Sequence, residues 1–157
     1  MELRLARAQE AQALWLIRNQ AVRAGCVGVY DADTIMAFTP DIMPAGFVAC
    51  ITQNPFFVIA ATAAGGPVAT GFLDVTRASV EAIFTLPAYQ GRGYAARILA
   101  RIISEAKTRG LTRLTLASTP NAVQFYRRRG FSILGEGQYY SASAQRYLFC
   151  VDMSLAL

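Results

Sequence analysis

Apolar residues recur along this chain with two periods, one typical of helices and one typical of strands. Where they recur every three or four positions, we expect helices at 9–23, 31–36, 44–52, 93–108 and 119–130. Where they form short runs or alternate with polar residues, we expect strands at 3–7, 56–62, 68–75, 79–86, 111–118, 131–136 and 146–155. The predicted order is strand, helices, three strands, helix, strand, helix and two strands.

The connections between these elements predict how the strands pair. Gly65 and Gly66 suit a hairpin turn, and short turns make the second, third and fourth strands antiparallel. The long fourth helix, closed by Gly110, is a crossover, so the fourth and fifth strands should lie parallel. We therefore expect an α/β fold with one mixed, mostly antiparallel sheet and helices packed on it.

The composition limits the class of protein. The chain has 157 residues, 54% hydrophobic and 16% charged, so we expect a single folded domain over 1–157 rather than disorder. It contains no histidine, which excludes Ser-His-Asp and Cys-His catalysis and most zinc sites. Its three cysteines are far apart without a C-x-x-C spacing, so we expect reduced thiols and no bound metal.

Charge and hydropathy indicate where the protein works and what it binds. No apolar run approaches the ~20 residues that span a bilayer, and no signal peptide opens the chain, so we expect a cytoplasmic protein without a membrane partner. The net charge of +5 indicates a polyanionic partner, which is a phosphorylated cofactor, a nucleic acid or an acidic surface. The arginines form no recognised nucleic-acid motif, so we expect no nucleic-acid partner.

The stretch LPAYQGRGYAARIL, residues 86–99, fits two kinds of phosphate-binding loop. Its Gly91-x-Gly93-x-x-Ala96 spacing matches the dinucleotide fingerprint, whereas Gln90-x-x-Gly93-x-Ala95 matches the pyrophosphate loop of acyl-CoA transferases. A dinucleotide site needs an acidic residue about 20 positions further on, and residues 107–134 contain none. The acyl-CoA loop is therefore favoured over the dinucleotide loop, with backbone amides and the helix dipole facing a pyrophosphate. Taken alone, the same residues could also be a glycine-rich helix start without a ligand.

A second motif follows on the next predicted helix. It has Asn121, Ala122, Phe125 and Tyr126 in an Asn-Ala-x-x-Phe-Tyr-x-x-x-Gly-Phe pattern, placed after a strand, helix and strand. Together with the Q-x-x-G-x-A loop, this pattern resembles the GNAT superfamily of acetyl-CoA-dependent N-acetyltransferases over residues 80–131. The resemblance implies a GNAT-like fold in which the parallel pair of strands splays around acetyl-CoA.

The resemblance also implies which residues hold acetyl-CoA. The backbone at the end of the fourth strand would pair with the pantetheine arm, the loop amides would bind the pyrophosphate, and an asparagine would bond the pantetheine side. The implied cofactor-binding residues are Phe84, Thr85, Leu86, Gln90, Gly91, Arg92, Gly93, Tyr94, Ala95, Ala96 and Asn121.

Two residues are candidates for acid–base chemistry. The resemblance implies that the Tyr126 phenol points at the thioester sulfur, although a tyrosine on a helix face can equally be a core residue. Glu81, the one acid in the fourth strand, is the candidate base, with Asp74 second. Strict alternation would place Glu81 on one face with Ile83 and Thr85, and a solvated strand start is the other interpretation of Glu81.

Other side chains could complete the site. Five arginines near the two motifs could contact CoA phosphates, and they are Arg92, Arg97, Arg127, Arg128 and Arg129. Five aromatic residues could line an acceptor pocket, and they are Trp15, Tyr30, Phe38, Tyr139 and Tyr140. The apolar strand at 146–155 could be a sheet edge that pairs with a second copy.

The leading hypothesis is an N-acetyltransferase that acetylates a primary amine of a small molecule or peptide. The alternative is a non-catalytic module that binds acyl-CoA for regulation. The sequence does not identify the acceptor.

Overall fold

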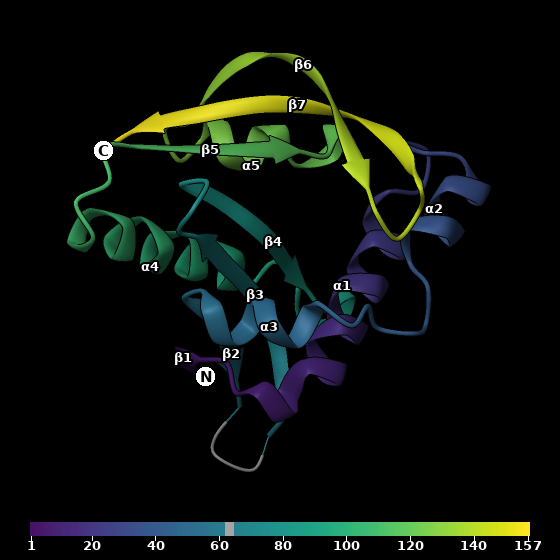
Figure 1. The fold of residues 1–157 in the computed structure, drawn as a ribbon, viewed down its shortest axis with the longest axis horizontal. Coiled ribbons are helices and arrows are strands. Elements are labelled where there is room, and N and C mark those ends of the chain that lie inside the picture. Colours follow the sequence, from purple (N-terminus) through teal and green to yellow (C-terminus); the bar gives the residue numbers. More distant parts are fainter. Residues whose placement is uncertain (62–64) are drawn as a thin grey trace.

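Seven strands form one sheet that carries helices on both faces. The computed structural model describes residues 1–61 and 65–157, and Figure 1 shows its arrangement. Along the sheet the strands follow the order β1-β2-β3-β4-β5-β7-β6. The strands are β1 (Glu2–Leu5), β2 (Phe56–Ala60), β3 (Pro67–Asp74), β4 (Ser79–Thr85), β5 (Arg113–Ser118), β6 (Ser132–Ser141) and β7 (Arg146–Ala156).

The helices lie close to their predicted positions. The α-helices are α1 (Ala11–Gly25), α2 (Ala32–Phe38), α3 (Phe47–Gln53), α4 (Tyr94–Thr108) and α5 (Val123–Arg127). Three short 3-10 turns join them, namely η1 (Ala8–Glu10), η2 (Pro87–Tyr89) and η3 (Pro120–Ala122). The predicted helix at 119–130 is divided between η3 and α5, and Gly130 ends it with φ +97°. None of the helices within the described ranges is long and apolar enough to cross a membrane.

The two faces of the sheet bury different side chains. Alternate residues of β2 point in opposite directions, so Phe57 and Ile59 pack with α4, whereas Phe56 and Val58 pack with α1 and α3. All four are at most 1% exposed, and burying each contributes about 1.5–3 kcal/mol. This packing fixes α1 and α4 on opposite sides of β4, which is where the two sequence motifs meet.

The predicted strand pairing is confirmed, and its parallel pair is short. β1 to β4 pair antiparallel in sequence order. β4 and β5 pair parallel at one register position only, Ser79 with Thr115, where the Thr115 N–H donates to the Ala78 carbonyl at 3.1 Å. Figure 1 shows the two strands separating beyond this point, with α4 as the crossover between them.

A bulge in β4 overturns the predicted face of Glu81. Phe72 pairs with Glu81 and Thr70 pairs with Phe84, so two residues of β4 lie opposite one residue of β3. Ala82 takes a left-handed conformation there, with φ +55°. Glu81 therefore shares its face with Ala82 and Phe84, whereas Ile83 turns toward α4. The prediction from strict alternation was wrong because the extra residue of the bulge shifts the alternation of side chains along β4 by one position.

The C-terminal strand does not lie at the edge of the sheet. β7 pairs with β5 on one side and with β6 on the other, both antiparallel. The edge strand is β6, which extends further than the predicted 131–136. The expectation that 146–155 forms a pairing edge was therefore wrong. The predicted end of the strand at residue 62 and the first two residues of the predicted turn, 63 and 64, lie outside the described residues.

Candidate active site

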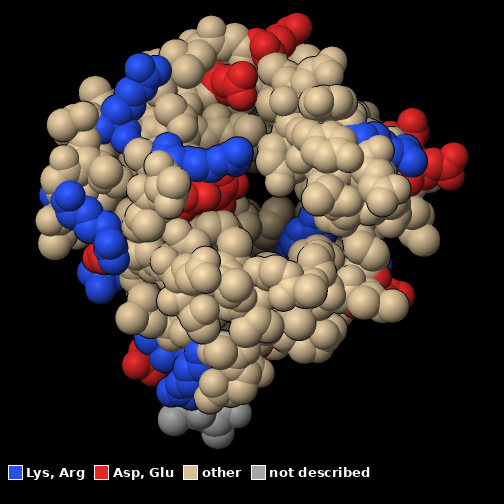
Figure 2. All heavy atoms as spheres, in the orientation of Figure 1, with Lys and Arg blue, Asp and Glu red and all other residues tan. Residues whose placement is uncertain are grey.

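The separation of β4 from β5 opens two adjoining pockets. The first, which we call the loop pocket, measures about 540 Å³ and lies between the ends of α1 and β4, the start of α4, and α5. The second, the aromatic pocket, measures about 760 Å³ and lies between α1, α2, α3, β4 and the β5–β7 half of the sheet. Phe84 and Thr119 line both. Figure 2 shows a deep opening in this face with acidic and basic side chains at its margin.

The loop before α4 presents a row of free amides to the loop pocket. Gly91 and Gly93 adopt φ +76° and +80°, which other residues rarely take. The first helical hydrogen bond runs from the Arg97 N–H to the Gly93 carbonyl at 3.1 Å. Among the described residues, the N–H groups from Gly91 to Ala96 have no hydrogen-bond partner. Such a helix start is an anion site, since its amides and its dipole both favour negative charge.

Most of the predicted cofactor-binding residues line this pocket, and two do not. Those that line it are Phe84, Thr85, Gln90, Gly91, Gly93, Tyr94, Ala95, Ala96 and Asn121. The N–H of Leu86 donates to Val68 at 2.8 Å and its carbonyl accepts from Tyr89 at 2.9 Å. We therefore do not assign Leu86 to the pantetheine arm. Arg92 lies over the Tyr89 ring, 4.9 Å from its centroid, and is also outside the lining.

The sequence prediction missed the end of α1, which forms one wall of the loop pocket. Ala21, Val22, Gly25 and Cys26 lie there beside Asn121. The Cys26 thiol lies 3.8 Å from the Asn121 Oδ1 atom, and a Cβ added at Gly25 would lie 3.4 Å from Asn121 Nδ2. Small residues one turn apart, Ala21 and Gly25, were the available signal for such a close approach.

Tyr126 is a buried phenol on the wall of the loop pocket. The residue is 9% exposed, and its ring packs edge-on against Phe125 and Phe131 at 5.1 and 5.8 Å. Within the described part of the chain no side-chain oxygen is both buried and unpaired, so the Tyr126 hydroxyl, which makes no hydrogen bond to the protein, is accessible from the loop pocket. Burial raises the pKa of Tyr126 well above its usual value, and the charge of Glu81 adds to this. The phenol is therefore protonated at neutral pH and free to donate a hydrogen bond.

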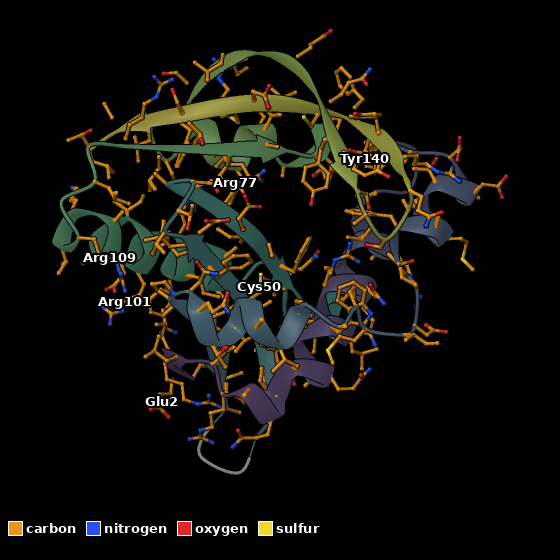
Figure 3. All side chains as sticks on the ribbon, viewed as in Figure 1. Glu2, Cys50, Arg77, Arg101, Arg109 and Tyr140 are labelled. Atoms are coloured by element: carbon orange, nitrogen blue, oxygen red, sulfur yellow. The ribbon has the colours of Figure 1, made fainter. Side chains whose placement is uncertain are left out.

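Glu81 lies in the aromatic pocket rather than the loop pocket. The Ser79 hydroxyl donates to its Oε1 atom at 2.8 Å. Burial raises the pKa of the Glu81 carboxyl, Asp74 adds to the increase, and Ser79 and Arg77 oppose it. A carboxylate with a raised pKa is a stronger base than an exposed one. Figure 3 shows Arg77 near the turn before β4 and Cys50 on α3, two further residues of this pocket.

The other sequence candidates divide between the pockets and the surface. Four of the five aromatic candidates line the aromatic pocket, namely Trp15, Tyr30, Phe38 and Tyr139. Tyr140 is 53% exposed and lies against Tyr147 instead. Of the five candidate arginines, Arg129 lines the loop pocket. In the described ranges, no group of three or more His, Cys, Asp or Glu side chains is placed to hold a metal.

The chain matches a family model and is similar in fold to solved acetyltransferase structures. The family model described as an acetyltransferase (GNAT) domain matches residues 26–144. A GCN5-related N-acetyltransferase from Rhodopseudomonas palustris superposes with a TM-score of 0.88 at 18% identity, covering 99% of this chain and 95% of its own. No curated protein matches the sequence.

Two similar structures were solved with a bound coenzyme. The PaiA N-acetyltransferase of Thermoplasma acidophilum, in complex with coenzyme A, has a TM-score of 0.78 at 14% identity, covering 99% of this chain and 98% of its own. A putative acetyltransferase of Salmonella typhimurium, with acetyl-CoA, has a TM-score of 0.71 at 22% identity, covering 100% of this chain and 94% of its own.

Proposed function

Because the chain belongs to the GNAT acetyltransferase family, whose chemistry is acyl transfer from acetyl-CoA, we propose that it acetylates a primary amine of a small molecule or peptide. The observation that carries this proposal is the meeting of two pockets at Phe84 and Thr119, one with a row of free amides and one with a buried carboxylate. The loop pocket takes acetyl-CoA and the aromatic pocket takes the amine.

The loop pocket fits the parts of acetyl-CoA. The free amides from Gly91 to Ala96 receive the pyrophosphate at the start of α4. The exposed backbone of Phe84 and Thr85 extends the sheet toward the pantetheine arm, and Asn121 borders its other side. The coenzymes bound in the Thermoplasma acidophilum and Salmonella typhimurium structures support this assignment.

Glu81 acts on the amine that is acetylated, and Tyr126 acts on the sulfur that leaves. The amine nitrogen forms a bond to the acetyl carbon and loses a proton, while the carbon–sulfur bond breaks and the thiolate leaves. A lysine-like amine has a pKa of about 10.4, so Glu81, directly or through a water, removes its proton. Tyr126, in the neighbouring pocket, donates a hydrogen bond to the departing sulfur.

The energetics favour hydrogen-bond donation over complete proton transfer by Tyr126. With reference pKa values of about 10 for a phenol and 8.5 for a thiol, complete transfer costs about 2 kcal/mol. Burial raises the pKa of Tyr126 further, which increases this cost. A hydrogen bond to the thiolate stabilises the leaving group without that transfer.

The test is thiol release from acetyl-CoA in the presence of a panel of primary amines. We expect Tyr126→Phe to lower kcat about 10- to 100-fold, because a hydrogen bond to a charged group contributes about 1.5–3 kcal/mol. Tyr140→Phe is the matched control, since Tyr140 lies outside both pockets. Full activity of Tyr126→Phe with a good acceptor would remove Tyr126 from the mechanism. Tight acetyl-CoA binding without turnover on any amine would instead indicate a regulatory binding module.

A further inference from the structure

Arg18 is held inside the aromatic pocket between two rings. Its guanidinium carbon lies 4.3 Å from the Trp15 ring centroid and 4.4 Å from that of Phe38. Burial lowers the pKa of Arg18 to about 10, so the side chain keeps its charge at neutral pH. Trp15 Nε1 and Asn19 Nδ2 both donate to the Pro40 carbonyl at 2.8 Å, which fixes the residues around Arg18.

This cation lacks a counterion among the described residues. Its Nη1 atom donates to Asn19 Oδ1 at 2.9 Å and to the Phe38 carbonyl at 2.7 Å, while Nε and Nη2 have no partner in the same part of the chain. The ion pairs of the structure join other arginines to Glu10, Asp41 and Glu105. A largely buried charge without a counterion is costly, and its two free donors remain accessible from the pocket, so an anionic group on a ligand would be favoured there.

The same pocket supplies the remaining features of a small-molecule site. Its volume of about 760 Å³ lies within the range of about 300–1,000 Å³ that such ligands occupy. Apolar walls come from Phe38, Phe47, Phe72 and Phe84. Glu81 lines the pocket from β4, so a carboxylate and a cation without a counterion line the same pocket.

Tyr139 connects these two charges. Its side chain lines the aromatic pocket, where burial raises the pKa of Tyr139, Glu81 adds to the increase, and Arg18 and Arg77 lower it. Arg77 is a second cation of the pocket, but it lies on the exposed turn before β4, where water weakens its interactions. Arg18 is therefore the better anchor for an anion.

We propose that the acceptor is a small molecule that carries a carboxylate as well as its primary amine, with the carboxylate bound by the free Nε and Nη2 donors of Arg18 and the amine directed toward Glu81. The proposal rests on the function proposed above. An Arg–carboxylate pair can form two parallel hydrogen bonds, which orients the ligand as well as holding it. The apolar walls hold the part of the acceptor between its two charged ends.

The first experiment compares amino acids with their neutral counterparts as acceptors. Phenylalanine, 4-aminobutyrate and 6-aminohexanoate are each paired with the corresponding carboxamide, and kcat/KM is measured by thiol release. We expect at least one carboxylate to exceed its carboxamide about tenfold or more, since hydrogen bonds to a charged group are worth that much. Equal or better use of the carboxamide in every productive pair would overturn the proposal.

The second experiment does not depend on turnover. Calorimetry measures binding of 3-phenylpropanoate and of its carboxamide to the protein saturated with CoA. We expect the carboxylate to bind about tenfold more tightly, with the difference shrinking as salt increases. Equal binding would overturn the anion site even if amines are acetylated, whereas selective binding without acetylation would overturn the proposed function alone.

Variants assign the preference to a residue. Arg18→Gln should reduce the preference for the carboxylate to about twofold or less, mainly through KM, and Arg18→Lys should retain part of it. Arg23→Gln is the matched control, because Arg23 also joins α1 to the segment after α2, with 2.6 Å to the Thr39 carbonyl. Loss of the preference in Arg77→Gln but not in Arg18→Gln would show that the anchor is wrongly assigned.

Discussion

Glu81 lowers the stability of the folded protein when its carboxyl is charged. Burial raises its pKa in the folded state above the unfolded value, so the folded protein binds this proton more tightly. The folded state therefore loses relative stability as the pH rises from the unfolded pKa through the folded pKa. Below the unfolded pKa of about 4.3 the carboxyl is neutral in both states and the penalty disappears.

We expect Glu81→Gln to lose activity and gain stability. The rate of acetyl transfer should fall about 100-fold, because the base is lost. The melting temperature should rise at pH 7, and the gain should vanish below about pH 4. Kinetics with a good acceptor and thermal unfolding across pH 3–8 measure both. A lower melting temperature at pH 7 would mean that the carboxylate stabilises the fold.

Residues in local motifs could be predicted from sequence, and those brought together by tertiary packing could not. Gln90, Gly91 and Gly93 lie close in the chain, so their spacing, together with the motif at 121–131, predicted an anion-binding loop. Arg18 reaches its pocket only because α1 packs beside α2 and β4, and no local pattern records this. Arg92 lies inside the motif, yet its side chain turns toward Tyr89.

At the scale of elements, the loop before α4 depends on left-handed glycine. A Cβ at Gly93 would meet open space, so the cost of a substitution comes from φ +80°. We expect Gly93→Ala to cost about 1–2 kcal/mol of stability and to weaken acetyl-CoA binding about tenfold, because the free amides are displaced.

Gly110 provides the matched control for this loop. It has φ +78° and also faces open space, but it lies at the other end of α4. Gly110→Ala should lose similar stability with unchanged acetyl-CoA affinity. Calorimetry and thermal unfolding separate the two effects, and equal loss of affinity in both variants would show that the loop amides are not the site.

The β4 bulge depends on Gly71 in the opposite strand. A Cβ there would lie 2.8 Å from Ile98 Cγ2 and 2.9 Å from Ile83 Cγ1. We expect Gly71→Ala to cost about 1–3 kcal/mol, because the overpacked side chains must shift. Gly46→Ala is the control, since a Cβ at Gly46 has no neighbour within 4 Å. Denaturant unfolding measures both, and equal stability of the two variants would contradict this packing.

Gly71 was also the overlooked signal for the bulge. A glycine inside a strand often marks a bulge or a close approach, and this one lies opposite Ala82 and Ile83. Counting alternate residues along β4 alone could not detect the shift, because the extra residue is defined only by pairing with β3. The face of β4 on which Glu81 lies therefore could not be predicted from the sequence of β4 alone.

At the scale of the whole molecule, acetyl-CoA should join the two halves of the sheet. β4 and β5 share one register pair, and the loop pocket spans both halves. At about 100 times its Kd, a ligand adds about 2.7 kcal/mol, which corresponds to a rise of roughly 5–10 °C in Tm. Differential scanning fluorimetry with acetyl-CoA measures it, and an unchanged Tm at high ligand concentration would contradict the assigned pocket.

The topology was predictable where connections are short. Hairpin turns and one helical crossover determined the arrangement from β2 to β5. The position of β7 was not predictable in the same way, because its residues pair with residues of β5 that lie 33–43 positions earlier in the chain. An apolar strand suits an edge covered by a partner and an interior position equally well.

The interior position of β7 also determines when the two strands beside it can pair as the chain leaves the ribosome. β5 and β6 are synthesised first, and both pair with β7 rather than with each other. Each therefore has an unpaired edge until residues 146–156 are made. Unpaired strand edges can attach to other chains during that delay. Premature termination before Arg146 would therefore yield an aggregating fragment rather than a weakened enzyme.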